Sequence, residues 1–451
     1  MSTFTQRIGH RGLACVIGAV ILAASAMPAV AQGKKAPAAK AAAPATKTAT
    51  PAAKAEQPAG QPLQIELSHQ LPPSRAKALQ ELIERFNAES KTSRVTLVDS
   101  SWQAANPPHM MILAGADEEA FLSSSKPRYK PLFALMKESG VALQTVKPAA
   151  MMTRKPLNAN GQLLALPVGL STPVLYFNRA AFKRAGLNAE TTPLATWPDL
   201  QSALGKLAAN GSRCPLTIVE PARVLIENVS AWDNVPVLKG KQPVFNGLFH
   251  VKYVSLMASW YRANLLKIFK DRAEAEERFA KGECATLIGP SDSWADFRQR
   301  NGLDAGVARL PYVVDDTAPG APQNTLASGA SLWVAAGKKA AENKAMASFI
   351  HFWLQPQNQI IWQRDAGYLP LSRAGFFASE TTLLGDSLEN IKVAIGQLTH
   401  KPATANSAVQ TALERESARR IIDEELNEVW ANRKSAKAAL DSAVMRLSTG
   451  K

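Results

Sequence analysis

The sequence predicts an α/β protein with more than one domain, and three observations lead to this fold class. The chain has 451 residues, whereas a single hydrophobic core stops growing at roughly 250–300 residues. Hydrophobic residues make up 46% of the chain and charged residues 20%, which excludes a wholly disordered protein. Short strand-like segments are followed repeatedly by helical apolar stripes. This alternation predicts largely parallel sheets covered by helices.

The first 31 residues predict export. They carry Arg7 and Arg11, then a short apolar stretch, and they end in Ala-Val-Ala at 29–31. A basic flank, a short apolar core and a small-x-small end are typical of a cleaved secretory signal peptide; an uncleaved anchor is the alternative. Cys15 precedes most of the apolar stretch, so it is not placed like the acylated cysteine of a lipoprotein. No later apolar run approaches the ~20 residues of a membrane-spanning helix, which excludes a polytopic membrane protein.

Residues 32–62 predict a disordered tether. They contain twelve alanines, five prolines and five lysines, and four of the prolines recur every seven residues. Proline at this spacing interrupts any helix that the alanines favour, and no large apolar side chain is present to form a core. An extended basic spacer is therefore expected; loose contact with anionic headgroups or a cell-wall polymer is the alternative.

The globular body, residues 63–451, alternates strands and helices in order. It opens with an alternating strand at 63–67, followed by a helix whose apolar residues fall at i, i+3, i+4 and i+7. That stripe consists of Leu79, Leu82, Ile83 and Phe86. Further strands are predicted at 94–98, 174–177, 285–288 and 331–334. Two later helices have apolar faces formed by Met346, Phe349, Ile350, Trp353 and Leu354, and by Ile421, Ile422, Leu426, Val429 and Trp430.

Charge and motifs favour a binding protein over an enzyme. The full chain has a net charge of +15, and the body alone has +9, with no run of five basic residues. Nucleic-acid binding is therefore not expected, while a modest positive field suits either a small anionic ligand or mere solubility. The chain has no G-x-S-x-G elbow, no phosphate-binding G-x-x-x-x-G-K-[ST] and no H-E-x-x-H. We expect no catalytic residues, no metal and no cofactor.

Two cysteines remain after the predicted leader, Cys214 and Cys284. An oxidising compartment allows them to form a disulfide. Two buried thiols are the alternative, because free cysteine packs as a small hydrophobe.

Four segments in one order resemble a known family. They are 171–178, Trp-Pro-Asp-Leu at 197–200, Gly-Ala-Ser-Leu-Trp at 329–333 and Gly-Tyr-Leu-Pro at 367–370. The chain resembles the extracellular solute-binding proteins of bacterial ABC importers, in the maltose-binding-protein-like group. Further segments bring it closest to the members that bind sn-glycerol-3-phosphate; these are 85–89, 226–232, 281–285 and 421–426.

The resemblance implies the type II periplasmic binding protein fold, with two α/β lobes joined by hinge-crossing segments around a ligand cleft. The first lobe would comprise 63–170 and 328–378, and the second lobe 171–327 and 379–451. The crossings would lie near 169–173, 327–330 and 376–382. Together with the leader, this places the protein in the periplasm, as a monomer that works with the membrane subunits of an ABC permease.

The resemblance also implies ligand contacts. Arg419 matches the arginine that holds the phosphate, and its neighbour Arg420 leaves the register open by one residue. Tyr368 would supply a hydroxyl and Gly329 a backbone N–H, which are donors that suit a phosphate. Ser171 matches a ligand serine at the first crossing. For each residue an ordinary structural role is the alternative.

The other half of the implied pocket departs from the family. Asp117 stands where a glutamate is expected, and a surface acid is the alternative. Trp102 could supply the aromatic wall that an absent tyrosine leaves, and Ser291 lies beside the position of a second ligand serine. The tryptophans expected between Cys214 and Glu227 are missing, and Glu220 and Arg223 occupy that region.

The leading functional hypothesis is capture of glycerol-3-phosphate or a glycerophosphodiester by lobe closure, followed by delivery to the permease. Two alternatives remain open. One is a sugar or oligosaccharide binder of the same fold. The other is an envelope scaffold or sensor whose cleft has degenerated.

Overall fold

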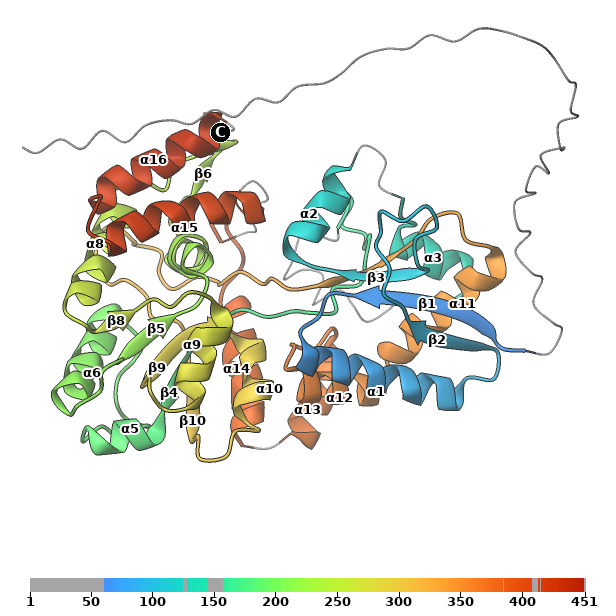
Figure 1. The fold of residues 1–451 in the computed structure, drawn as a ribbon, viewed down its shortest axis with the longest axis horizontal. Helices are drawn as coiled ribbons and strands as arrows, with labels where there is room; N and C mark the ends of the chain where they lie inside the picture. Colours follow the sequence, from blue (N-terminus) through green and yellow to red (C-terminus); the bar gives the residue numbers. More distant parts are fainter. Residues whose placement is uncertain are drawn as a thin grey trace, which may run out of the picture. The chain divides into compact units, whose positions relative to one another are not determined.

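The computed structural model describes residues 61–124, 128–143, 157–383, 385–407, 413 and 415–449. The predicted leader with Cys15, and all but the last two residues of the predicted tether, lie outside the described residues. Within these ranges, helices accompany two main sheets (Figure 1), and no helix is long and apolar enough to cross a bilayer.

The first sheet is four-stranded, in the order β11-β3-β1-β2. β1 pairs in parallel with β2 and with β3, while β11 pairs antiparallel with β3. The alternating segment in β1 buries Ile65 and Leu67 completely, as the period-2 pattern predicts. The strands are β1 (Leu63–His69), β2 (Ser93–Leu97), β3 (Met110–Leu113) and β11 (Ser331–Val334).

The helices around this sheet pack through the predicted stripes. All four residues of the stripe beginning at Leu79 are buried, and the ring of Phe86 meets that of Phe349 edge-on at 5.1 Å between centroids. Figure 1 shows α1 and α2 on opposite sides of the sheet. The helices are α1 (Pro73–Glu89), α2 (Gly115–Ser123), α3 (Leu132–Glu138), α11 (Ala340–Trp353), α12 (Pro356–Ala366) and α13 (Arg373–Thr382).

The second sheet is five-stranded, in the order β10-β4-β9-β5-β8. Cys214 and Cys284 lie just before two neighbouring parallel strands, β5 and β9. Their sulfur atoms are joined, with Cα atoms 4.5 Å apart. The strands are β4 (Pro173–Asn178), β5 (Leu216–Ile218), β8 (Leu266–Lys267), β9 (Thr286–Pro290) and β10 (Ala305–Ala308), and a separate hairpin comprises β6 (Leu238–Lys239) and β7 (Gln242–Pro243).

The helices that accompany the second sheet include one with a full capping box. In α6 the Thr196 hydroxyl accepts from the Asp199 N–H at 3.3 Å, and the Asp199 carboxylate accepts from the Thr196 N–H at 3.1 Å. The Trp-Pro-Asp-Leu segment is thus the first turn of a helix. The helical elements are α5 (Arg179–Arg184), α6 (Trp197–Ala209), η1 (Ala222–Asn228), α7 (Val229–Trp232), α8 (Leu248–Arg262), α9 (Arg272–Ala280), η2 (Ser291–Ser293), α10 (Trp294–Phe297), α14 (Asp386–Leu398), α15 (Glu416–Trp430) and α16 (Ala436–Thr449).

Both sheets are mixed, and this corrects the prediction of largely parallel sheets. β4 pairs antiparallel with both β9 and β10, and β11 pairs antiparallel with β3. β4 and β11 are the strands that enter a sheet from a crossing segment. They arrive without the helical crossover that makes consecutive strands of one sheet parallel.

The two predicted proline- and glycine-containing crossings run side by side. Ser171 and Ser328 exchange both backbone hydrogen bonds at 2.9 Å. Gly329 has a φ of +142°, and a Cβ there would lie 1.4 Å from the carbonyl oxygen of Gly169. The third predicted crossing, near 376–382, falls on α13, which contacts α12, and the next helix, α14, contacts β4 and β10. The close approach of the first two crossings therefore requires glycine at position 329.

Substitution of Gly329 by alanine should test that approach. We expect Gly329→Ala to lower the free energy of unfolding by more than about 3 kcal/mol, because a backbone carbonyl blocks the new Cβ. Gly337→Ala is the matched control: φ is +76° and no atom lies within 4 Å of the new Cβ, so we expect a cost of about 1 kcal/mol. Equal costs in chemical denaturation would contradict the steric constraint.

Candidate functional site

A cleft of about 260 Å³ lies where segments from both sheets meet. Residues that follow β1 and β3 line it from the first sheet, and residues that follow β5 and β9 line it from the second. Both crossing segments, α15, Arg272 of α9 and Tyr368 complete the wall. The cleft therefore lies at the carboxyl ends of parallel strands, which is where α/β sheets bind ligands.

Four of the predicted site residues line this cleft: Ser171, Gly329, Tyr368 and Arg419. The Ser171 hydroxyl accepts from the Asp292 N–H at 3.3 Å, so Ser171 connects the first crossing to the end of β9. Tyr368 is 7% exposed, and its ring lies 5.7 Å from that of Trp362. Burial raises the pKa of its hydroxyl, which stays a neutral donor.

Three other predicted residues do not line the cleft. Trp102 packs edge-on against Phe121, with ring centroids 5.4 Å apart, in a separate apolar cluster. Ser291 is fully buried, with its hydroxyl 3.3 Å from that of Ser171. Asp117 lies in the first turn of α2. The side of α2 that faces α15 does not include it and consists of Ala116, Glu119, Ala120 and Ser123. Sequence proximity to a ligand motif does not determine which way each side chain points.

Arg419 is held by a buried carboxylate. Its Nε donates to Oε1 of Glu227 at 2.6 Å and its Nη2 to Oε2 at 2.9 Å. This is the side-on bidentate geometry that fixes a guanidinium plane. Glu227 is 4% exposed and Arg419 14%. The neighbouring Arg420 is 74% exposed, so Arg419 is the one of these two arginines that lines the cleft.

A strained segment after β5 brings two more charged side chains to the cleft. Glu220 has a φ of +49°, a conformation that non-glycine residues rarely adopt. Pro221 follows it, and then the π-helix η1, which carries Arg223 and Glu227. Arg223 Nη1 pairs with Glu220 Oε2 at 2.8 Å. Strained backbone and π-helices both concentrate at functional sites.

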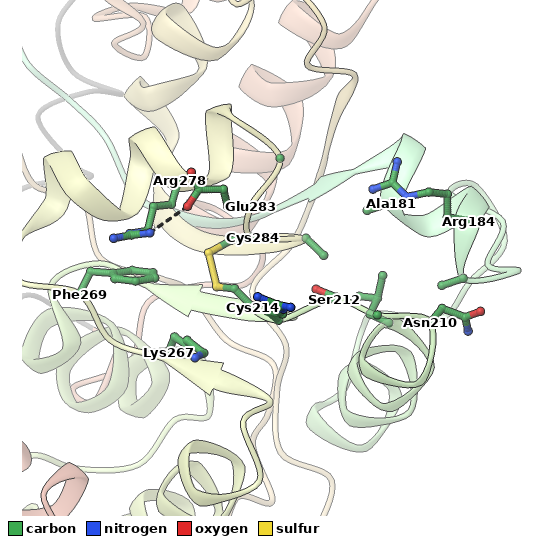
Figure 2. Close-up of a pocket in the computed structure, with 16 residues that line it drawn as sticks. Ala181, Arg184, Asn210, Ser212, Cys214, Lys267, Phe269, Arg278, Glu283 and Cys284 are labelled. Carbon is green, nitrogen blue, oxygen red and sulfur yellow. Dashed lines mark hydrogen bonds and ion pairs between the residues drawn. A yellow bond between two sulfur atoms is a disulfide. The ribbon is translucent and has the colours of Figure 1, made fainter.

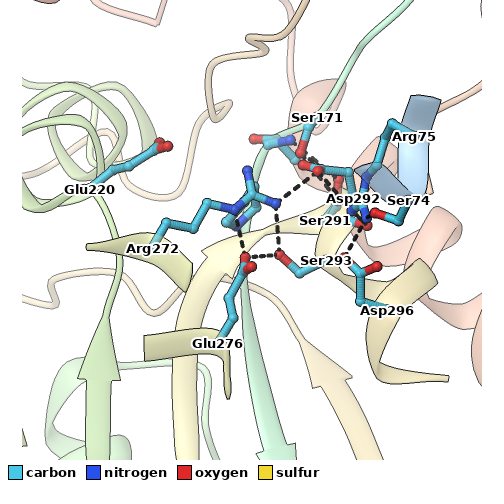
Figure 3. Close-up of polar contacts among 12 residues, drawn as sticks. Ser74, Arg75, Ser171, Glu220, Arg272, Glu276, Ser291, Asp292, Ser293 and Asp296 are labelled. Carbon is cyan, nitrogen blue, oxygen red and sulfur yellow. Dashed lines mark hydrogen bonds and ion pairs between the residues drawn. The ribbon is translucent and has the colours of Figure 1, made fainter. Parts of the chain in front are cut away.

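A buried ion-pair network forms one end of the cleft (Figure 3). Arg75, in the first turn of α1, is 1% exposed and contacts both Asp292 (3.1 Å) and Asp296. Arg272 Nη2 contacts the same oxygen of Asp292 at 2.8 Å. Burial alone would raise the pKa of Asp292, but Arg272 and Arg75 hold it well below its ordinary value. Asp292 therefore stays ionised and joins α1 to the second sheet.

Asp423, on α15, is the lining carboxyl that titrates near neutrality. Its Oδ1 accepts from the Ala222 N–H at 2.7 Å. Burial and the nearby carboxylates of Glu220, Glu416 and Glu227 raise its pKa to about 7, against the effect of that hydrogen bond.

The cleft is polar and close to charge balance. Three arginines (Arg223, Arg272 and Arg419) and four acidic residues (Glu220, Asp292, Glu416 and Asp423) line it among the described residues. Guanidinium groups bind phosphate or carboxylate, and carboxylates accept from hydroxyl or ammonium groups. The arrangement can therefore hold a small ligand that carries both an anion and hydrogen-bond donors.

Two further cavities lie outside this cleft. A groove of about 600 Å³ between α2 and α15 shares Glu416 and Asp423 with the cleft, so it continues from it. The disulfide is part of the wall of a cavity of about 490 Å³ (Figure 2). This cavity lies at the ends of β5 and β9 opposite the cleft, and Arg184, Arg213, Lys267 and Arg278 line it. None of the predicted ligand residues lines it.

The sequence indicated some of the residues it did not assign. Glu220 and Arg223 stand where tryptophans were expected, and that departure was the available signal. Arg272, Asp292 and Asp423 had no such signal, because their partners lie on other elements. Among the described residues, no group of histidine, cysteine and acidic side chains could hold a metal ion.

The comparisons identify the family. Residues 80–381 match the family of bacterial extracellular solute-binding proteins. This match covers more than half of the chain, and the chain therefore belongs to that family.

Individual relatives cover most of the chain. The sn-glycerol-3-phosphate-binding periplasmic protein UgpB of Pectobacterium atrosepticum is 30% identical over 399 residues, which cover 84% of this chain and 89% of that protein. UgpB of Escherichia coli is 29% identical, and the match covers 84% of this chain and 90% of that protein. UgpB from Mycobacterium tuberculosis in complex with glycerophosphocholine has a TM-score of 0.70 at 19% identity, covering 86% and 98%. Maltose-bound T. maritima MalE3 has a TM-score of 0.66 at 16% identity, covering 86% and 100%.

These findings confirm two predictions. The fold is that of the two-lobed periplasmic binding proteins. The function is that of a solute-binding protein of ABC importers. The relatives are binding proteins rather than enzymes.

Removal of Arg419 should destabilise the fold through Glu227. We expect Arg419→Ala to lower the free energy of unfolding by about 3 kcal/mol, because a buried carboxylate loses its partner. Addition of Glu227→Gln should restore more than half of that loss. Arg420→Ala, at an exposed neighbour, should change stability by less than about 0.5 kcal/mol. A large single-variant loss that Glu227→Gln does not reduce would contradict this pairing.

Asp423→Asn should change how stability depends on pH. The folded protein holds this proton up to about pH 7, whereas the unfolded chain releases it near 3.8. Asp423 should therefore contribute stability that is present below about pH 4 and is lost by about pH 7, and the variant should lack this contribution. Denaturant unfolding at about pH 5 and pH 8 measures it. If the natural protein and the variant differ in free energy of unfolding by the same amount at pH 5 and at pH 8, Asp423 does not titrate in this range.

Proposed function

We propose that this chain captures a glycerol phosphate, either sn-glycerol-3-phosphate or a glycerophosphodiester, and delivers it to the membrane subunits of an ABC permease. The observation that carries this proposal is the convergence of Arg223, Arg272 and Arg419 on one cleft that also contains Ser171 and Tyr368. Guanidinium groups, hydroxyls and a tyrosine supply the donors that a phosphate ester requires. The relatives named for glycerol-3-phosphate binding support the same ligand class.

The continuation of the cleft favours a ligand with a head group. The groove between α2 and α15 opens from the cleft at Glu416 and Asp423. Acidic residues dominate this region: Glu119 and Glu424 also line it, against Arg420. A phosphodiester could place its phosphate among the arginines and a cationic head group in the groove. The Mycobacterium tuberculosis structure with glycerophosphocholine supports ligands of this kind.

The mechanism that we propose is lobe closure without bond chemistry. Ligand stabilises the closed form only by the difference between its contacts there and in the open form. The predicted leader favours action in the periplasm. We further propose that the protein is a monomer, does not bind nucleic acid and has no catalytic activity.

A sugar ligand is the second candidate, because sugar-binding proteins share the fold. Sugar sites stack ring faces on aromatic side chains. Tyr368 is the single aromatic residue among the described residues that line the cleft. This composition favours the phosphate ligand. The third alternative, a scaffold with a degenerate cleft, differs from both binding candidates because no ligand should stabilise its native state.

The decisive measurement is calorimetry and thermal unfolding with three ligands: sn-glycerol-3-phosphate, glycerophosphocholine and maltose. We expect one or both phosphates to bind and to raise Tm, since a ligand at 100 times its Kd stabilises the native protein by about 2.7 kcal/mol. Maltose should have no effect. Binding of maltose alone would favour the sugar reading, and no binding at all would favour the scaffold.

A binding-site variant completes the test. Arg419→Ala alone would leave Glu227 unpaired, so the guanidinium is removed together with that charge in Arg419→Ala/Glu227→Gln. We expect this double variant to bind the phosphate ligands at least about tenfold more weakly. Unchanged affinity would contradict the placement of phosphate beside Arg419.

A further inference from the structure

We propose that Glu220 is an internal competitor for the ligand's anionic group: its carboxylate pairs with Arg223 in the cleft that Arg272 and Arg419 also line, and a phosphate binds there by displacing it. This inference rests on the proposed function and deepens it. It assigns the anion subsite to three arginines and gives a specificity role to a residue that no ligand motif marks.

One arginine contacts Glu220, and two arginines from other elements line the same cleft. Arg223 comes from η1 and contacts Glu220 directly, at 2.8 Å between Nη1 and Oε2. Arg272 comes from α9 and Arg419 from α15, and both line the same cleft as Glu220. Burial would raise the pKa of the Glu220 carboxyl, but Arg223, Arg272 and Arg419 together hold it below its ordinary value. The field at this point therefore favours an anion.

Two of the three arginines, Arg272 and Arg419, are held independently of Glu220. Arg419 is held by Glu227 through two hydrogen bonds, and Arg272 is held by Glu276 at 2.7 Å and Asp292 at 2.8 Å. Those three carboxylates have side chains no more than 17% exposed. Glu220 is 38% exposed, so it is the carboxylate that can move towards solvent. Displacement then leaves a preorganised anion site.

Arg223 is incompletely satisfied by Glu220. Its side chain is 10% exposed, and its Nη2 is buried without a hydrogen-bond partner in the described part of the chain. A buried guanidinium nitrogen without a partner is costly. A phosphate presents three acceptor oxygens and can accept from both Nη1 and Nη2, which the single contact with Glu220 does not achieve.

The backbone holds Glu220 in this place at a cost. Its φ is +49°, and Pro221 after it disfavours the ordinary helical alternative. The Ala222 N–H that follows is bonded to Asp423, which anchors the turn on α15. Strain of this kind is maintained where it serves binding. Here it accompanies the ion pair between Glu220 and Arg223.

The consequence is a pair of substitutions with opposite effects. Glu220→Gln removes the competitor, so we expect phosphate-bearing ligands to bind about tenfold more tightly. Arg223→Gln removes a donor, so the same ligands should bind at least about tenfold more weakly. Because asparagine tolerates positive φ, Glu220→Asn should also bind more tightly, and it provides a second variant if glutamine disturbs the turn.

Calorimetry on the full exported chain, with sn-glycerol-3-phosphate, glycerophosphocholine and inorganic phosphate, tests the inference. Glu428→Gln is the matched control: it removes an equal charge that pairs with Arg433 outside the cleft, and it should change affinity less than about twofold.

The outcomes separate the two proposals. Tighter binding in Glu220→Gln with weaker binding in Arg223→Gln supports the inference. Equal or weaker binding in both Glu220 variants, while the natural protein binds, overturns the inference and leaves the proposed function intact. An equal gain in Glu428→Gln also overturns it, because a general charge effect would then explain the result. No binding of any probe by the natural protein or by either Glu220 variant overturns the proposed function and this inference together.

Discussion

The fold depends on one buried carboxylate that joins segments distant in the chain. Asp292, in the short helix η2 that follows β9, contacts Arg272 from α9 and Arg75 from α1. Arg75 lies in the first turn of a helix, where the helix dipole disfavours a cation, so its position requires these acidic partners. A buried charge without a partner costs several kcal/mol. The same network therefore joins the two sheets, forms one end of the cleft and positions Ser171.

Elsewhere in the cleft, buried carboxylates fix the orientation of two guanidinium groups. Glu227 sets the plane of Arg419, and Glu276 and Asp292 set that of Arg272. A binding site gains affinity when its donors already point at the ligand, because less freedom is lost on binding. Glu220 differs from these carboxylates in its exposure and in its strained backbone. If a ligand displaces Glu220 as proposed, this distinction between fixed and movable carboxylates lets a polar, nearly neutral cleft favour an anion.

Several features of the site could be predicted from the sequence and several could not. Ser171, Gly329, Tyr368 and Arg419 reach the cleft because the motifs that carry them lie at crossings and element ends. Trp102 and Asp117 do not reach it, because helix phase and local packing turn them elsewhere. The close approach of Gly169 and Gly329 is visible only when both crossings are in place. The antiparallel direction of β4 and β11, the strands that enter a sheet from a crossing, is likewise visible only in the assembled structure.

By itself, the sequence determined the order of strands and helices, the apolar faces that become buried, and the family to which the chain belongs. These depend on periodicities of two and 3.6 residues and on short motifs, which are local properties. The tertiary structure alone decided which charges meet. Arg75 and Asp292 are 217 residues apart in the chain, and Arg419 and Glu227 are 192 apart. No local pattern encodes such a pair, because its energy arises only once folding has removed both groups from water.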